Sequence, residues 1–297
     1  MSPSHEEVFT PATPGLDRSR LALLWLLAAF LPTVVRLALF GAVGSYGFDW
    51  SIYHHGLELW ASTGSPYQVP PPGWDPLAWT PYMYTPASWP LLVATVLPAP
   101  ITLLALLPIA LTPPTFWLIP LGALFMLIGL GPGALSANVS LLVAGLLALS
   151  FRPGRLGGIA FACALAIRPY PLVLLPFLWG DRTRLRWFLA TTAALVVSGT
   201  LLFGLGAWRD FVLTFLHESD TAPSLSPFAL LGPLRAIPAL GVAFVGLLLR
   251  SPTITLAGAT WLGGYVSPHY YVTLAATLPF ERVCGREHAK CAVLVSR

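Results

Sequence analysis

Long apolar runs that carry almost no charge constrain this chain more than any other feature. Between Leu21 and Gly180 the acidic residues are Asp49, Glu58 and Asp75 alone. Charged residues make up 9% of the whole chain and hydrophobic residues 56%, whereas a soluble domain averages about 25% charged residues. An apolar run of about 20 residues is long enough to cross a bilayer as a helix. The sequence therefore predicts an all-α, polytopic membrane protein.

About eight to ten transmembrane helices are expected from the distribution of the apolar runs. The expected spans are 21–44, 81–98, 99–112, 114–131, 133–151, 155–179, 187–207, 228–249 and 253–280. Prolines crowd residues 81–131, which leaves two full spans or three short ones there, and the last run is either one broken span or two. The expected organisation is a cytoplasmic tail over 1–19, an integral membrane domain over 20–280, and a polar tail over 281–297.

Arginines in short loops orient the expected spans, because cytoplasmic loops are enriched in basic residues. The arginines that mark the cytoplasmic side are Arg18, Arg20, Arg182, Arg184 and Arg186. The loop 45–80 then faces outward. Arg152 and Arg155 fit this orientation badly if three spans separate them from the outer loop.

The outer loop 45–80 carries a pattern that is typical of a short helix lying in the membrane interface. Apolar residues recur at helical spacing from Trp50 to Trp60, with His54, His55 and Glu58 between them. Prolines beyond this segment stop the helix, and aromatic residues follow where the chain re-enters lipid.

Asp49 stands at the start of this expected helix, where the first apolar run should leave the membrane. A carboxylate at a membrane–water boundary can accept a proton close to a lipid-borne substrate. Aspartate is also a favoured N-cap residue. A catalytic role and a capping role are compatible at this position.

Motifs for other chemistries are missing from the sequence. It contains no Asp-x-Asp pair, no glycine-rich phosphate loop and no His-Glu-x-x-His. Cys284, His288 and Cys291 lack a fourth metal ligand. The basic residues are scattered through short loops, which argues against a nucleic-acid partner. We therefore expect no cofactor and no metal.

A series of short motifs, taken in order, resembles a known family. The motifs are Asp49 after the first span, Gly64-Ser65-Pro66-Tyr67, Tyr84-Thr85-Pro86, Ala137-Asn138, Ile167-Arg168-Pro169-Tyr170-Pro171 and Ser267-Pro268-His269-Tyr270-Tyr271. Their order and spacing resemble family eighty-seven of the glycosyltransferases, which use polyprenyl-phosphate-mannose and have the GT-C fold. The chain departs from the family pattern at Ala137, where a glycine is usual, and at Arg168, where a lysine is more common.

The resemblance implies an inverting transfer of a sugar, mannose or a pentose, from a polyprenyl phosphate to an acceptor hydroxyl on the outer face of the membrane. The acceptor would be a glycolipid or glycan, and the location a multi-pass position in a bacterial plasma membrane. Asp49 would act as the general base. The residues implied in binding donor or acceptor are Arg168, His269, His54, His55, Tyr67 and Tyr84. The lipid-linked sugar is a substrate, so no cofactor is implied.

Several of these residues have plainer interpretations. Arg168 could pair with a carboxylate inside the bundle or extend its charge to the interface. His54 and His55 could lie on a solvated helix face, His269 could be an ordinary helix-end histidine, and Asn138 could hydrogen-bond a neighbouring helix.

Two other functions remain open from the sequence. A membrane transporter or lipid flippase would also contain an intramembrane arginine and broken helices. Such a protein is expected to show inverted repeats with charges near the midplane of both halves, whereas here the charges gather in one outer loop. The sequence also continues only briefly after Ser267-Pro268, which leaves a truncated, inactive relative as an alternative.

Overall fold

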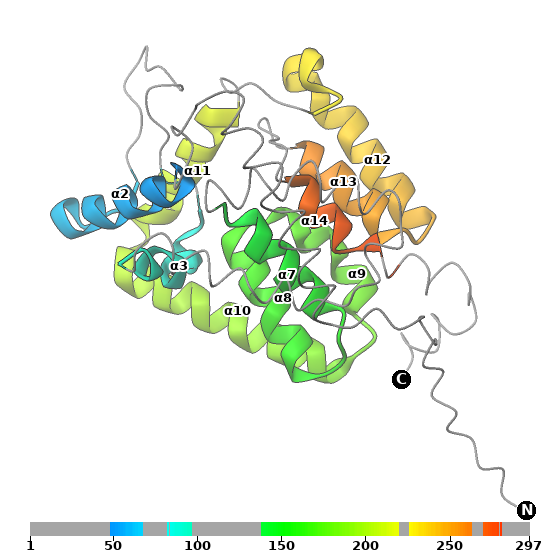
Figure 1. Ribbon diagram of the computed structural model, residues 1–297, viewed down its shortest axis with the longest axis horizontal. Helices are drawn as coiled ribbons and strands as arrows, with labels where there is room; N and C mark the ends of the chain where they lie inside the picture. Colours follow the sequence, from blue (N-terminus) through cyan, green and yellow to red (C-terminus); the bar gives the residue numbers. More distant parts are fainter. Residues whose placement is uncertain are drawn as a thin grey trace, which may run out of the picture.

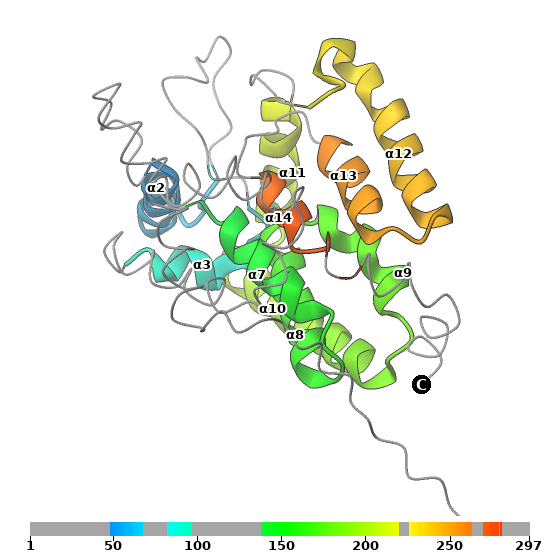
Figure 2. The ribbon, with the colours of Figure 1, turned by 45° about the vertical axis from the view of Figure 1, so that its right-hand side comes forward.

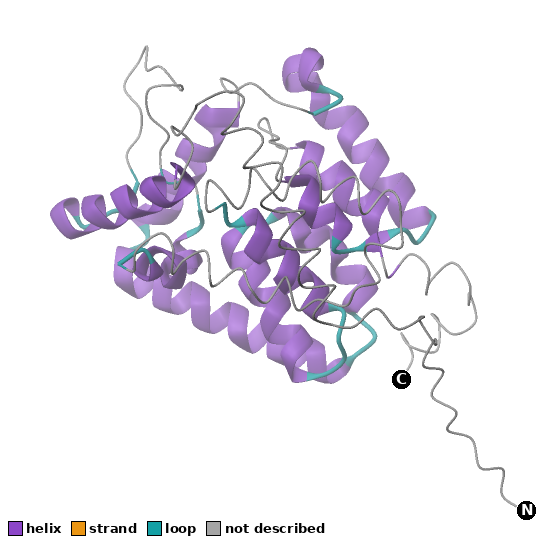
Figure 3. Cartoon of the chain, viewed as in Figure 1, coloured by secondary structure: helices purple, strands orange, loops and turns teal. Residues whose placement is uncertain are grey.

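The computed structural model describes residues 48–67, 82, 84–96, 138–219, 226–262, 270–278 and 280. Throughout these residues the regular elements are helices and no strand occurs, which confirms the all-α prediction for this part of the chain (Figures 1 and 3). The elements are α2 (Phe48–Thr63), η1 (Pro86–Ser88), α3 (Trp89–Ala94), α7 (Ser140–Ser150), α8 (Arg155–Ile167), η3 (Tyr170–Leu174), α9 (Leu175–Leu178), α10 (Arg182–Phe203), α11 (Gly206–Ser219), η4 (Ala229–Arg235), α12 (Ala236–Leu248), α13 (Pro252–Leu262) and α14 (Tyr271–Ala275).

Helices α8 and α10 pack side by side and run in the same direction. Near their first turns, Gly158 lies so close to α10 that a Cβ atom there would collide with the carbonyl oxygen of Arg184. Further along α10, Gly199 makes an equally close approach to the backbone of Pro86 in η1. The hydroxyl of Thr85, the residue before η1, donates to the carbonyl oxygen of Ala166 at the end of α8. The ends of both helices therefore meet at the segment that precedes α3.

The chain leaves the helical conformation at Arg168, where φ is −135° and ψ is 118°. A residue before proline is pushed out of the helical region, and Pro169 follows Arg168 directly. Helix α8 accordingly ends at Ile167, and the short elements η3 and α9 carry the chain onward. The prediction of one continuous span over 155–179 was therefore wrong.

One helix among the described residues, α10, is long and apolar enough to cross a membrane, with 22 residues and a mean hydropathy of 1.5. At a rise of about 1.5 Å per residue, α10 extends about 33 Å. Helices α7, α8 and α12 are apolar but shorter. The expected spans 21–44, 99–112 and 114–131 lie outside the described residues, and a total of eight to ten spans stays a prediction.

Helices α12 and α13 form a close antiparallel pair in which glycine lets the backbones touch (Figure 2). A Cβ atom at Gly246 would collide with the backbone nitrogen of Thr255, and one at Gly258 with that of Ala243. The outward face of α12 leaves large apolar side chains such as Phe244 exposed, at 61% of its surface. Contiguous apolar surface of this kind is typical of contact with lipid or another protein.

Five arginines gather at one end of the α8–α10 pair, and we call this group the arginine end. Its members are Arg152, Arg155, Arg182, Arg184 and Arg186. The backbone N–H of Gly154 donates to Asp181 Oδ2 at 2.6 Å, and the Arg155 guanidinium lies 4.1 Å from the ring centroid of Trp187. The two arginine-bearing loops therefore lie on the same side of the molecule, as the positive-inside rule requires.

Helix α2 lies toward the opposite end of α10 from the arginine end (Figures 1 and 2). The Trp60 ring of α2 packs edge-on against Phe203, the last residue of α10, with ring centroids 4.9 Å apart. The length of α10 therefore separates the predicted cytoplasmic arginines from the predicted outer-loop helix.

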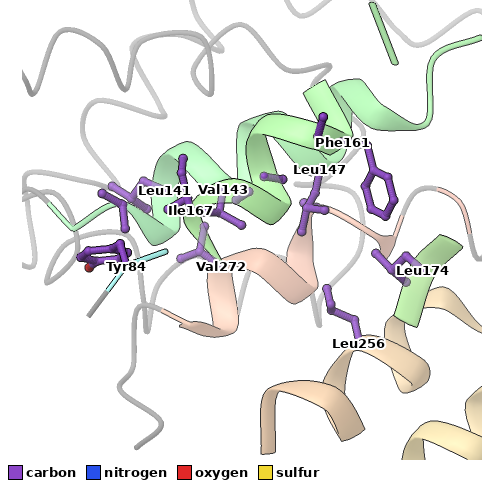
Figure 4. Close-up of a cluster of buried hydrophobic side chains, with 14 of the residues drawn as sticks. Tyr84, Leu141, Val143, Leu147, Phe161, Ile167, Leu174, Leu256 and Val272 are labelled. Atoms are coloured by element: carbon purple, nitrogen blue, oxygen red, sulfur yellow. The ribbon is translucent and has the colours of Figure 1, made fainter. Parts of the chain in front are cut away.

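A buried apolar cluster connects the segments that surround Arg168. Its fully or nearly fully buried members include Val143 and Leu147 of α7, Phe161 of α8, Leu256 of α13 and Val272 of α14. Figure 4 draws part of this cluster, with Tyr84 at one edge of it. Packing of these side chains from four helices fixes the surroundings of the site described below.

Candidate active site

Arg168 occupies the break after α8 and is buried, with 7% of its surface exposed. Its Nη2 donates to the hydroxyl of Tyr84 at 3.2 Å. Its guanidinium carbon lies 4.6 Å from the ring centroid of Tyr84 and 4.9 Å from that of Tyr270. Rings from two distant segments of the chain thus hold the planar cation.

No Asp or Glu among the described residues forms an ion pair with Arg168. Its buried Nε atom also has no hydrogen-bond partner in this part of the chain. Two cation–π contacts contribute about 0.5–2 kcal/mol each, whereas removing an ion from water costs several kcal/mol. The side chain neither reaches a described carboxylate nor extends to the surface, so within the described residues its charge has no counter-ion and its Nε has no hydrogen-bond partner.

A short hydrogen-bonded path connects Arg168 to helix α2. The hydroxyl oxygens of Tyr84 and Tyr53 lie 2.8 Å apart, and the ring of Tyr53 packs edge-on against that of Tyr84. Tyr53 is fully buried, and its hydroxyl also accepts the backbone N–H of Val139 at 3.3 Å. The side chain of one α2 residue therefore meets both the Arg168 site and the start of α7.

Tyr67 contacts the backbone of Tyr84. Its hydroxyl donates to the carbonyl oxygen of Tyr84 at 2.5 Å. Burial raises the pKa of Tyr67 above its ordinary value, so the hydroxyl stays protonated and keeps donating. Tyr82 packs beside it and shares a hydrogen bond with Ser88 Oγ at 2.7 Å. The structure thus places Tyr67 in the buried packing around Tyr84.

Asp49 is the second residue of α2, which begins at Phe48 and ends at Thr63. The prediction of a helix that includes Trp50 to Trp60 is confirmed, and its place in an outer loop stays a prediction. The helix begins at Phe48, so Asp49 is the second residue of its first turn and is not the N-cap that the sequence suggested. An acid in the first turn remains favourable for the helix dipole. The side chain of Asp49 lies outside what the structure describes.

The helix ends where Gly64 adopts a φ of +80° and donates its N–H to the carbonyl oxygen of Trp60 at 2.9 Å. A left-handed residue after the last turn is the usual glycine termination of a helix. The glycine of the Gly64-Ser65-Pro66-Tyr67 motif therefore has a local structural reason to be present.

The histidines of α2 have partners within the protein. His54 Nδ1 donates to the carbonyl oxygen of Thr95 at 3.1 Å, and its ring stacks on Trp50 with centroids 4.7 Å apart. His54 and His55 each approach a carboxylate oxygen of Glu58 to 3.6 Å. His54 therefore ties α2 to the segment after α3.

Two further predicted residues differ in their outcome. His269 lies outside the described residues. Asn138 is buried, and its Oδ1 accepts the backbone N–H of Ser140 at 2.8 Å. Asn138 thus stabilises the start of its own helix, α7, and the described hydrogen bonds do not join it to a neighbouring one as expected.

The sequence does not indicate that the Tyr53 hydroxyl contacts Tyr84 and Val139. In the apolar spacing of the expected helix this tyrosine counts only as one more buried position. Tyr270 belongs to one of the sequence motifs, but the sequence does not indicate its contact. In the structure its ring covers one face of the Arg168 guanidinium. The available signal was weak, because phenolic side chains are equally common in membrane-interface aromatic belts.

A model of glycosyltransferase family 87 matches residues 75–283 of this chain. The chain belongs to this family. It is therefore a glycosyltransferase, acting on a sugar donor and an acceptor, and family membership favours this activity over a transporter or flippase. The match includes Tyr84, Arg168 and His269 and begins after α2, which carries Asp49. No significant match was found among curated proteins or among solved structures.

Proposed function

We propose that this family 87 enzyme takes its sugar, as mannose, from a polyprenyl phosphate and transfers it to a hydroxyl of a glycolipid or glycan. The observation that carries this proposal is the environment of Arg168. A buried guanidinium between two tyrosine rings, which among the described residues has no carboxylate partner and no acceptor for its Nε–H, is suited to a phosphate group.

The reaction has two needs that the chain can meet. The acceptor oxygen attacks the anomeric carbon from the face opposite the phosphate, and the bond from that carbon to the phosphate oxygen breaks. Polyprenyl phosphate leaves with the bonding electrons, and Arg168 stabilises the charge that develops on its oxygen. The acceptor proton passes to a general base, and the configuration at the anomeric carbon is inverted.

Asp49 is the residue that we propose as this base. It is one turn before Tyr53 on α2, and Tyr53 reaches the Arg168 site through Tyr84. His269 immediately precedes Tyr270, whose ring lies over Arg168, so we propose that it contacts the donor as well. The proposed enzyme needs no cofactor, because the donor brings its own phosphate leaving group.

The orientation of the proposed enzyme follows from the two ends of α10. The arginine end would face the cytoplasm and α2 would lie at the outer surface of the cell membrane, within a GT-C-type bundle of several spans. A cysteine at Ser62, an exposed residue near the end of α2, should then react with an impermeant thiol reagent applied from outside. Labelling that occurs only after lysis would place the site on the cytoplasmic face.

The experiment that tests the proposed function compares the wild type with Asp49→Asn and Glu58→Gln in isolated membranes. Each sample receives radiolabelled polyprenyl-phosphate-mannose and a pool of membrane lipids as acceptor. We expect transfer by the wild type, loss of transfer by Asp49→Asn, and retention by Glu58→Gln, an exposed acid of the same helix. Equal labelling by Asp49→Asn and the wild type at equal protein level would rule out Asp49 as the base.

A further inference from the structure

Helix α2 packs against the rest of the described structure through one of its faces. Tyr53 is its fully buried large side chain, and Gly56, less than one turn later, lies against Tyr82, whose Cδ2 would be 3.0 Å from a Cβ atom at this position. Residues on the other side of the helix, such as Ser51 and Ala61, are exposed. Tyr53 is therefore the fully buried one among the contacts that set the position of α2, together with those of His54 and Trp60.

Asp49 and Tyr53 are four residues apart on one helix. Residues at this spacing lie on the same helix face, one above the other, with Cβ atoms about 5–6 Å apart. Any rotation or sliding of α2 therefore moves both positions together. Whatever fixes the Tyr53 side chain also fixes the backbone position of Asp49.

The partner of Tyr53 is the same tyrosine that holds Arg168. Tyr84 Oη accepts from Arg168 Nη2 at 3.2 Å and lies 2.8 Å from Tyr53 Oη. Tyr53 Oη in turn accepts the N–H of Val139 at 3.3 Å. The two phenols therefore share one hydrogen bond between them, and each also receives one from a different element.

We propose that Tyr53 is a positioning residue, which acts through Tyr84 to keep the helix of the general base in one register with the phosphate-binding Arg168. This inference rests on the proposed function above. Its physical reason is that an attacking hydroxyl and a leaving phosphate must lie on opposite sides of one carbon atom. A misplacement of about 1 Å between groups that hold them can cost about 100-fold in rate.

Replacing tyrosine by phenylalanine tests this inference cleanly, because the ring keeps its edge-on packing and loses only the hydroxyl. For Tyr53→Phe we expect kcat to fall about tenfold or more, with the KM for the donor unchanged, because Arg168 still holds the phosphate. For Tyr84→Phe we expect a similar fall in kcat together with a raised donor KM, because Arg168 loses its hydroxyl partner. The double variant should have the kcat of Tyr84→Phe alone, because both changes cut the same connection.

Tyr82→Phe is the matched control. It also removes one buried tyrosine hydroxyl that shares a hydrogen bond, here with Ser88, but this hydroxyl is not part of the Arg168–Tyr84–Tyr53 path. We expect its kcat to stay within twofold of the wild type, at a thermal stability similar to that of Tyr53→Phe. A general effect of buried hydroxyl loss would lower the kcat of all three variants alike.

The measurement uses the full chain in lipid nanodiscs, with the labelled polyprenyl-phosphate-mannose and the acceptor lipids named above. A kcat of Tyr53→Phe equal to that of Tyr82→Phe would overturn the inference. So would additive losses in the double variant. If Tyr53→Phe folds poorly, Tyr84→Phe tests the same hydrogen-bonded path. An unchanged kcat of Tyr84→Phe would exclude a role of this path in positioning α2. If the wild type transfers no mannose, the proposed function is contradicted, and the inference, which rests on it, falls as well.

Discussion

Arg168 and the arginine end use the same side chain in opposite ways. At the arginine end, Arg184 Nε lies 3.7 Å from Asp181 Oδ2 and Arg155 stacks on Trp187 at an exposed position. Arg168 is buried between tyrosines and has no described carboxylate partner. Arg184 is also largely buried, but it has a carboxylate partner, and the exposed Arg155 has a ring partner, so both charges can stabilise the loops that carry them. The charge of Arg168 has no carboxylate partner among the described residues, and we propose that it binds the donor phosphate.

The largest effect should come from Arg168→Met, which keeps much of the side-chain volume and removes the charge. We expect transfer to fall about 100- to 1,000-fold, as when a charge-stabilising donor is removed from an active site. Thermal stability should be unchanged or higher, because a buried charge without a counter-ion is costly. Transfer assays and thermal unfolding of the purified protein check both parts.

The corresponding change at the arginine end is Arg184→Met, for which we expect the opposite effects on transfer and stability. The variant should keep transfer and lose stability, because it removes a partner of Asp181. If Arg168→Met unfolds the protein and Arg184→Met leaves its stability unchanged, the contrast that we expect between the two sites is contradicted.

A smaller effect is expected from Arg168→Lys. Lysine keeps the positive charge but has a compact ammonium group in place of the planar guanidinium, so it loses ring stacking and paired donation to phosphate. We expect a loss of about tenfold in kcat/KM, mostly through a higher donor KM. A variant that matches the wild type would show that charge alone is sufficient at this position.

Asp181 should make the stability of the folded protein depend on pH. Burial alone would raise its pKa, but hydrogen bonds from the backbone of Gly154, Arg184 and Thr183, with the Arg184 charge, together lower the pKa below the ordinary value. A carboxyl whose pKa is lower in the folded state stabilises it above the ordinary pKa of about 4. This stabilisation is lost as the pH falls through the folded value.

Two Asp181 variants separate the charge of this residue from its capping of α10. Asp181→Ala should cost about 1 kcal/mol of stability at pH 7, the usual value of an N-cap. Asp181→Asn should keep the cap, and the stability gap between it and the wild type should shrink from pH 6 to pH 3. Thermal unfolding across this range measures both effects, and a gap that widens in acid would contradict the assignment.

The smallest effect should come from Arg155→Gln. An exposed arginine over a tryptophan ring is worth about 0.5–1 kcal/mol. We therefore expect a slightly lower melting temperature and unchanged transfer. A large loss of transfer would mean that the arginine end takes part in the reaction.

The sequence predicted the local features of this protein well where they depend on neighbouring residues. The apolar spacing from Trp50 to Trp60 predicted α2, since a helix exposes residues with a period that the sequence itself displays. The break at Arg168 was equally local, because Pro169 was visible in the sequence. It was nevertheless missed, since hydropathy alone treated 155–179 as one apolar run.

The family and the residue types of the site were also available from the sequence. The motif around Arg168 and the Tyr84-Thr85-Pro86 motif are both recognisable in the sequence. Contact between them required the structure, since Tyr84 and Arg168 are 84 positions apart. The sequence likewise could not resolve whether Arg152 and Arg155 share a side with Arg182.

The amino-acid sequence by itself determined an apolar chain that is helical throughout its described elements, a glycosyltransferase signature, and an acid in the first turn of α2. Periodicity, proline positions and hydropathy determine structure over a few neighbouring residues, so the sequence alone is sufficient to predict these features. The tertiary structure alone decided that Tyr53, Tyr84 and Tyr270 gather around one guanidinium, which has no carboxylate partner among the described residues. Such a cluster arises from packing between segments far apart in the chain, and no local pattern encodes which buried tyrosines will meet.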